Sequence, residues 1–111
     1  MIIGYARVSK VEDQDTAAQL QALKIAGAER IFEETASGGR WDRPELHRAL
    51  DFLREGDVLA VWKLDRLSRS LRHFVNLVHD LNQRGVQFES LTEKIDTSNP
   101  YGELFFYFIA L

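Results

Sequence analysis

Hydrophobic positions along the chain alternate between short continuous runs and helical stripes. The run at residues 2–8 is rich in β-branched side chains and predicts a strand. After a polar gap, Leu20 and Leu23 stand three apart and Gly27 supplies a stop signal, which together predict a helix. Residues 30–34 predict a second, shorter strand.

Two further helices are predicted where apolar residues recur at i, i+3, i+4 and i+7. The first begins at Pro44 and ends near Gly56, and the second ends at Gly85. Residues 57–64 lie between them and contain the unbroken apolar run VLAVW, typical of a central strand covered on both faces. Residues 86–91 predict a fourth strand.

This alternation of strands and helices predicts an α/β fold. We expect a mostly parallel central sheet of about four to five strands, with right-handed crossovers and helices on both faces. A length of 111 residues is enough for one hydrophobic core, so residues 1–111 are expected to form a single domain.

The final stretch, GELFFYFIAL, is apolar on nearly all sides and ends without a capping residue or a polar tail. It must be buried in the core, against a partner subunit, or against a continuation of the chain that has been removed, and the sequence favours neither the core nor the partner. We expect the chain to be cut short at this point.

Composition adds a puzzle about charge. The formal net charge is −3, yet WKLDRLSRSLR at residues 62–72 carries four cations. An acidic surface does not attract a polyanion, so contact with nucleic acid would depend on local placement of arginines. The absence of cysteine excludes disulfides and thiolate chemistry and agrees with a cytoplasmic protein. No run approaches the ~20 apolar residues of a membrane span, so no membrane role is expected.

Candidate chemistry gathers where strands are predicted to end. Side chains two apart in a strand share a face, so Tyr5, Arg7 and Ser9 should project together. The carboxyl ends of parallel strands meet at one edge of a sheet, where ligands usually bind. The central strand and the loop after the second strand should deliver further groups to that edge: Lys63, Asp65, Arg66, Arg69, Ser37, Arg40 and Arg43.

Several guanidinium groups around one hydroxyl suit a phosphodiester undergoing transfer, because pentacovalent phosphorus carries extra negative charge. The three histidines lack ligand spacing, so we expect a mechanism without metal or cofactor. Each group alone is a weak signal. Asp65 and Arg69 could form an ordinary i, i+4 helix pair, and Ser9 could be a turn former or helix cap.

Taken together, the motifs resemble those of the serine recombinase family of resolvases and DNA invertases. They are YARVS at 5–9, Gln19, ASG at 36–38, DRP at 42–44, GD at 56–57, WKLDRLSRS at 62–70 and SLTEKIDT at 90–97. Two departures are Ser68, where many relatives have glycine, and Glu34, where a shorter acid is common. Neither removes a group that the chemistry needs.

The resemblance implies an N-terminal catalytic domain in which Ser9 attacks a DNA phosphate and leaves a 5′-phosphoserine link. It also implies that Arg7, Arg43, Arg66 and Arg69 bind the scissile phosphate and that Asp65 orients them or relays a proton. Supporting roles fall to Gln19, Ser37 and Lys63, while Arg40 and Arg72 are left as solvated or accessory charges.

In this family a long dimerisation helix leads into a DNA-binding domain. The resemblance thus implies that the chain ends at the start of that helix, and that the full protein is a homodimer that assembles into a tetramer on DNA. The fragment alone is expected to be inactive. A different class of function, a non-catalytic phosphate-binding or assembly module on the same scaffold, stays open because fold does not fix function.

Overall fold

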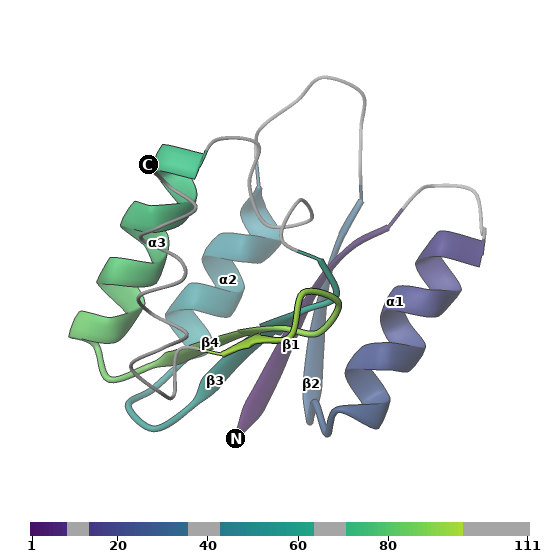
Figure 1. The fold of residues 1–111 in the computed structure, drawn as a ribbon, viewed down its shortest axis with the longest axis horizontal. Coiled ribbons are helices and arrows are strands. Elements are labelled where there is room, and N and C mark those ends of the chain that lie inside the picture. The colour runs from purple at the N-terminus through teal and green to yellow at the C-terminus, as the bar shows by residue number, and fades with distance from the viewer. Residues whose placement is uncertain (9–13, 36–42, 64–70, 97–111) are drawn as a thin grey trace.

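The computed structural model describes residues 1–8, 14–35, 43–63 and 71–96, and Figure 1 shows their arrangement. The predicted order of strands and helices is confirmed, with one short strand added at the end. The elements are β1 (Ile2–Val8), α1 (Gln14–Ile25), β2 (Arg30–Thr35), α2 (Pro44–Phe52), β3 (Val58–Val61), α3 (Leu71–Gln83), β4 (Gln87–Ser90) and β5 (Ile95–Asp96).

The strands form one sheet in the order β2-β1-β3-β4-β5. Four of them are parallel, and β5 pairs antiparallel with β4. The strand with the unbroken apolar run, β3, stands in the middle of this order, as its sequence predicted. Both β3 and β4 are shorter than predicted, since the apolar residues Trp62, Val86 and Leu91 lie just outside their bounds.

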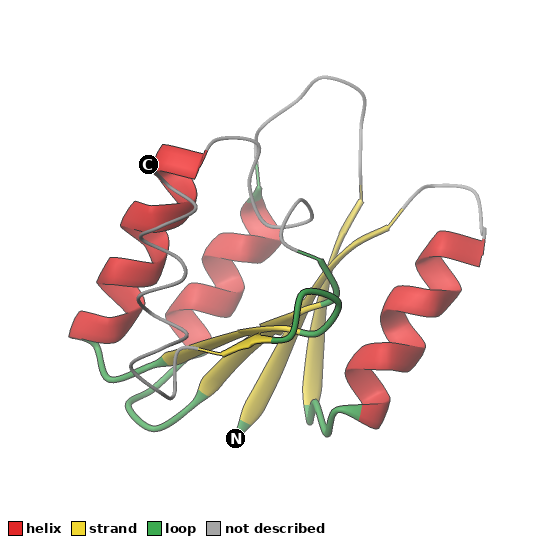
Figure 2. Cartoon of the chain, viewed as in Figure 1, coloured by secondary structure: helices red, strands yellow, loops and turns green. Residues whose placement is uncertain are grey.

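Helices cover both faces of the sheet, as predicted: α2 and α3 lie on one side and α1 on the other (Figure 2). The larger core lies under α2 and α3 and includes Tyr5, Leu59 and Phe88, all fully buried. The smaller core lies under α1 and centres on Ala6, Leu23 and Ala60. The fold prediction is therefore confirmed, while the expected dimerisation helix lies outside the described residues.

Glycine follows the ends of α1 and α3, as the sequence indicated: Gly27 and Gly85 have φ of +98° and +75°. These left-handed conformations cost little without a Cβ atom, which is why these two boundaries were readable from sequence. The end of α2 differs, because this helix ends at Phe52 with Leu53 as an extended C-cap, and Gly56, with φ +92°, lies in the turn before β3.

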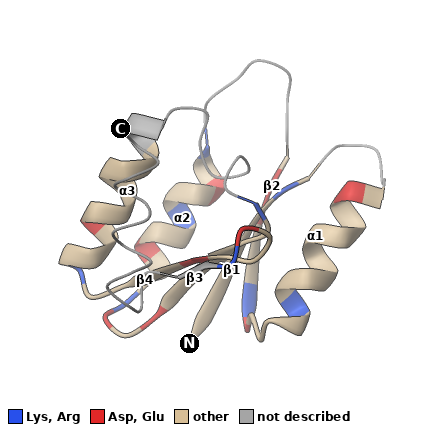
Figure 3. Cartoon of the chain, in the orientation of Figure 1, with Lys and Arg blue, Asp and Glu red and all other residues tan. Residues whose placement is uncertain are grey.

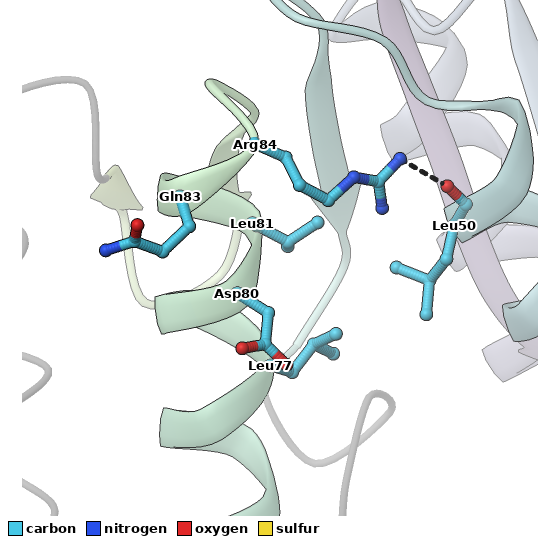
Figure 4. Close-up of a pocket in the computed structure, with 6 residues that line it drawn as sticks. All are labelled: Leu50, Leu77, Asp80, Leu81, Gln83 and Arg84. Carbon is cyan, nitrogen blue, oxygen red and sulfur yellow. Dashed lines mark hydrogen bonds between the residues drawn. The ribbon is translucent and has the colours of Figure 1, made fainter.

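A shallow groove separates α2 from α3, and Arg84 reaches across it (Figure 4). Its Nη2 donates to the carbonyl oxygens of Leu50 and Leu53 at 2.8 and 2.9 Å. Leu50 belongs to the last turn of α2 and Leu53 is its C-cap residue, where the helix has no internal donors left for the carbonyls. The guanidinium therefore caps α2 from the end of α3 and fixes the distance between the two helices.

None of the described helices is both long and apolar enough to cross a membrane.

Candidate active site at the carboxyl edge of the sheet

Four of the nine predicted site residues fall in the described part of the chain: Arg7, Gln19, Arg43 and Lys63. They come from β1, α1, the start of α2 and the residue pair after β3. Figure 3 shows basic segments at the carboxyl end of β1 and at the start of α2. The remaining five predictions lie outside the described residues: Ser9, Ser37, Asp65, Arg66 and Arg69.

Alternation along β1 places Tyr5 on the α2 and α3 face and Ala6 on the α1 face, as predicted. Arg7, two residues beyond Tyr5, shares its face. The parallel register sets Arg7 opposite Glu34 of β2. A cation and an anion are thus direct neighbours on adjacent strands at the carboxyl edge.

Glu34 is the most connected side chain of this edge. It is only 6% exposed, and its Oε1 accepts hydrogen bonds from the Tyr5 hydroxyl at 3.3 Å and from the Leu46 N–H at 3.3 Å. The Glu45 N–H donates to Oε1 at 3.2 Å and to Oε2 at 3.4 Å. One carboxylate therefore ties together β1, β2 and the first turn of α2.

Arg43 joins the same cluster from the residue before α2. It is 8% exposed, and its guanidinium acts on the Tyr5 hydroxyl by charge and hydrogen bonding, both of which lower the pKa of that group. Arg7 also acts on the Tyr5 hydroxyl through its charge. Two arginines 36 positions apart in the sequence are thus brought to one phenol.

The environment of Tyr5 raises the pKa of its hydroxyl from 10.0 to about 12. Burial of the phenol is the largest cause. The positive charge of Arg43 lowers the pKa, the Glu34 carboxylate raises it, and the hydrogen bond from Arg43 and the charge of Arg7 lower it again. The phenol therefore stays protonated at neutral pH and can donate to Glu34.

This shift predicts a loss of stability in alkali that depends on Tyr5. The pKa of the Tyr5 phenol is higher in the folded than in the unfolded protein, so its contribution to the free energy of unfolding is complete below pH 10. This contribution, up to about 3 kcal/mol, is lost as the pH rises towards 12. Urea unfolding from pH 8 to 11.5 should show the free-energy difference between wild type and Tyr5→Phe narrowing above pH 10. A constant difference across that range would contradict the raised pKa.

Gln19 is fully buried and acts on the backbone of Arg7. Its Nε2 donates to the Arg7 carbonyl at 2.7 Å, and its Oε1 accepts from the Arg7 N–H at 3.2 Å. The Asp15 carboxylate also accepts from Nε2 at 3.2 Å. Pairing of β1 with β3 stops at Tyr5 and Val61, so the Gln19 amide binds Arg7 just past the end of that ladder.

Replacing Gln19 with leucine should lower the free energy of unfolding by about 2 kcal/mol. The apolar side chain fills similar space but leaves the N–H and carbonyl of Arg7 without their partners. Urea unfolding measures the loss. Gln21→Leu, at an exposed position of α1, is the matched control and should change stability by no more than about 0.5 kcal/mol.

Lys63 lies at the same edge of the sheet but contacts a different group. It stands two residues past Val61, as Arg7 stands two residues past its partner Tyr5. Its Nζ lies over the ring of Trp62, 4.5 Å from the ring centroid. Lys63 is therefore near the end of β3, with its ammonium held by a cation–π contact rather than by the Glu34 cluster.

Sequence reasoning did not include Tyr5 and Glu34 among the site residues, although the structure places Glu34 opposite Arg7 and Tyr5 beside Arg43. Alternation along β1 did give the shared face of Tyr5 and Arg7, and that signal could have added Tyr5. Nothing local marks Glu34, whose partners come from β1 and α2. In the described part of the chain, no three His, Cys, Asp or Glu side chains gather in a way that could hold a metal ion.

A mostly parallel open sheet with the buried Arg43, the partly buried Arg7 and a carboxylate at its carboxyl edge defines an α/β domain suited to an anionic ligand. The family can be named directly: residues 2–111 match the model of the resolvase N-terminal domain, and the chain belongs to that family. The family prediction from the sequence motifs is thereby confirmed.

Named relatives are recombinases and invertases. The chain is 56% identical over 107 residues to the serine recombinase gin of Escherichia phage Mu, covering 96% of this chain and 55% of that protein. It is 50% identical over 105 residues to the DNA-invertase hin of Salmonella typhimurium, covering 95% and 55%. The chain thus spans about half the length of these curated relatives.

A solved structure of another protein has a similar fold. The N-terminal catalytic domain of TP901-1 integrase is 30% identical, with a TM-score of 0.79, covering 98% of this chain and 90% of that one. The sheet and helices described above therefore share the fold of that domain.

Proposed function

We propose that this chain is the catalytic domain of a site-specific DNA recombinase that cleaves and rejoins DNA strands through a 5′-phosphoserine intermediate. The observation that carries the proposal is that Arg7 and Arg43 both act on Tyr5 at the carboxyl edge of the sheet. Ser9 comes two residues after Arg7 in the sequence. Family membership and the names of the relatives support the reaction class.

In the proposed reaction, the Ser9 hydroxyl attacks the scissile phosphorus. The Ser9 hydroxyl gives up its proton as a bond forms between Oγ and phosphorus, the bond to the 3′ oxygen breaks, and that oxygen takes up a proton, so the strand leaves with a 3′-hydroxyl. The energy of the phosphodiester is kept in the serine ester, so attack by a 3′-hydroxyl can reverse the step and join new strands.

Arginines neutralise the charge that develops on the equatorial oxygens. The proposal gives this role to Arg7, Arg43, Arg66 and Arg69, with Asp65 orienting them or relaying a proton. Ser37 and Lys63 would support phosphate binding, and Gln19 would hold the backbone of Arg7. No metal or cofactor takes part in this scheme.

The proposed partners are DNA and further copies of the same protein. We propose a homodimer that assembles into a tetramer on two recombination sites in the cytoplasm, with DNA affinity supplied by a further DNA-binding domain of the full-length protein. The length of the relatives, nearly twice the matched region, supports such an additional part.

The test is formation of a covalent protein–DNA adduct by the full-length protein on a nicked recombination site, with and without EDTA. The expected result is an adduct that resists denaturation and forms at the same rate in both conditions. Failure to form an adduct under any assembly condition would favour a non-catalytic phosphate-binding module. An adduct that EDTA abolishes, with the protein still folded, would overturn the arginine-based mechanism.

A further inference from the structure

At the start of α2, the residue in the N-cap position does not itself cap the helix. The residue in the N-cap position is Arg43, with φ −129° and ψ 67°, and its side chain does not cap the helix. Serine, threonine, aspartate and asparagine are preferred there because their oxygens accept from the first N–H groups. An arginine side chain has no acceptor to offer.

The first-turn donors of α2 are nevertheless accounted for. Pro44, the first helical residue, has no N–H, and the His47 N–H donates to the Arg43 carbonyl at 3.2 Å in the first intrahelical bond. The two N–H groups between them belong to Glu45 and Leu46, and both donate to Glu34. The Glu34 carboxylate of β2 thus caps α2 in place of the N-cap side chain, and its negative charge is favourable at the positive end of the helix dipole.

The same carboxylate is linked to the Arg43 side chain. The Tyr5 hydroxyl donates to Glu34, and the Arg43 guanidinium acts on the same hydroxyl. Tyr5, Glu34 and Arg43 are all buried, so these bonds are shielded from competing water. The backbone of Arg43 is fixed through the α2 turn, and its guanidinium through the phenol.

From this arrangement we infer that Glu34 and Tyr5 are positioning residues for Arg43: Glu34 takes over the cap of α2 so that an arginine can occupy the cap position, and Tyr5 fixes the direction of its guanidinium. The inference rests on the proposed function, because it assigns a purpose to the position of Arg43. It goes further in making the rate of strand cleavage depend on two side chains that need not touch DNA.

A double-mutant cycle on the full-length protein tests this. Glu34→Gln keeps the length of the side chain and one acceptor oxygen for the α2 turn, but removes the charge. We expect it to slow adduct formation in a single turnover on the order of tenfold, since small displacements of a positioned group are costly. The DNA dissociation constant should stay within about twofold, because one phosphate contact is a minor part of binding.

The decisive comparison is made in an Arg43→Lys background. If Glu34 acts through Arg43, Glu34→Gln should cost little further rate there, and Tyr5→Phe should behave in the same way. An equal loss of rate in both backgrounds, at temperatures where urea unfolding shows each variant folded, would overturn the inference and leave Glu34 as a helix cap only. Glu33→Gln, on the exposed face of β2, is the matched control.

A second measurement needs no DNA. In the 111-residue chain labelled with ¹⁵N, the Arg43 Nε–H signal should shift or broaden in Glu34→Gln and in Tyr5→Phe but not in Glu33→Gln. An unchanged signal in both variants would contradict the inference even if wild type cleaves DNA. If wild type forms no adduct while the signal responds as expected, the positioning holds and the proposed function fails.

Discussion

Replacement of Ser9 by alanine is expected to abolish the covalent DNA adduct of the full-length protein. The proposed reaction has a single nucleophilic atom, Ser9 Oγ, and alanine offers no substitute for it. Loss of a nucleophile in enzymes that form covalent intermediates lowers the rate by on the order of 10⁴-fold or more, which is below detection in a gel assay. DNA binding should persist, because phosphate contacts rather than the serine hydroxyl supply affinity.

Thr35→Ala is the matched control for Ser9→Ala. Thr35 ends β2 at the same edge of the sheet and exposes its hydroxyl, yet it has no place in the proposed mechanism. It should form adduct at the wild-type rate. Adduct formation by Ser9→Ala at a rate comparable to wild type would remove Ser9 as the nucleophile, and mapping the modified residue by mass spectrometry would show which one replaces it.

Arg43→Lys should have the second largest effect, slowing adduct formation by about 10²-fold. Lysine keeps the positive charge but not the planar fork that can bind two phosphate oxygens and at the same time hydrogen-bond Tyr5. Removal of one well-placed donor to a developing oxyanion costs a factor of this size in enzymes. A single-turnover assay at saturating protein separates this loss of rate from any loss of DNA binding.

The control for Arg43→Lys is Arg48→Lys on the same helix. The Arg48 side chain is 73% exposed and pairs with Glu45 at 3.3 Å, so the exchange should leave the rate unchanged. Urea unfolding of both variants guards against a loss caused by instability. If Arg43→Lys cleaved as fast as wild type, the charge at position 43 would suffice and the fixed geometry around Tyr5 would have no part in catalysis.

The prediction for Ser9 and the prediction for Arg43 rest on different kinds of evidence. The motif YARVS places Ser9 two residues beyond Arg7, and this local spacing is enough to nominate a nucleophile. Arg43 was nominated by the motif DRP, but its burial against Tyr5 comes from packing. The sequence motif therefore gave the identity of the arginine, and the structure gave the contacts that hold it.

Some of the fold was readable because the signals are local. Residues 2–8 were predicted as a strand and form β1 over the same range. Gly27 and Gly85 marked the ends of α1 and α3, where the backbone needs a positive φ, whereas α2 ends before Gly56. The unbroken apolar run predicted the middle strand, since only a strand buried on both faces needs no polar alternation. The two-residue β5 was not predicted, because so short a segment has no periodicity.

Long-range relations could not be read in this way. Gln19 was nominated as a supporting residue, yet its two bonds to the Arg7 backbone depend on how α1 packs on β1. The convergence of Glu34, Tyr5 and the α2 turn depends on parallel pairing of β2 with β1. Each involves residues at least 11 positions apart.

The sequence by itself determined the α/β alternation, the helix ends, the family and the residue types available for chemistry, because each of these follows from local periodicity, turn chemistry or a contiguous motif. Only the tertiary structure decided the order of the strands, the capping of α2 by Glu34 and the burial of Arg43 beside Tyr5. The physical reason is that a hydrogen bond or a buried charge is fixed by distance in space, and chain folding brings together groups whose separation in sequence carries no sign of their contact.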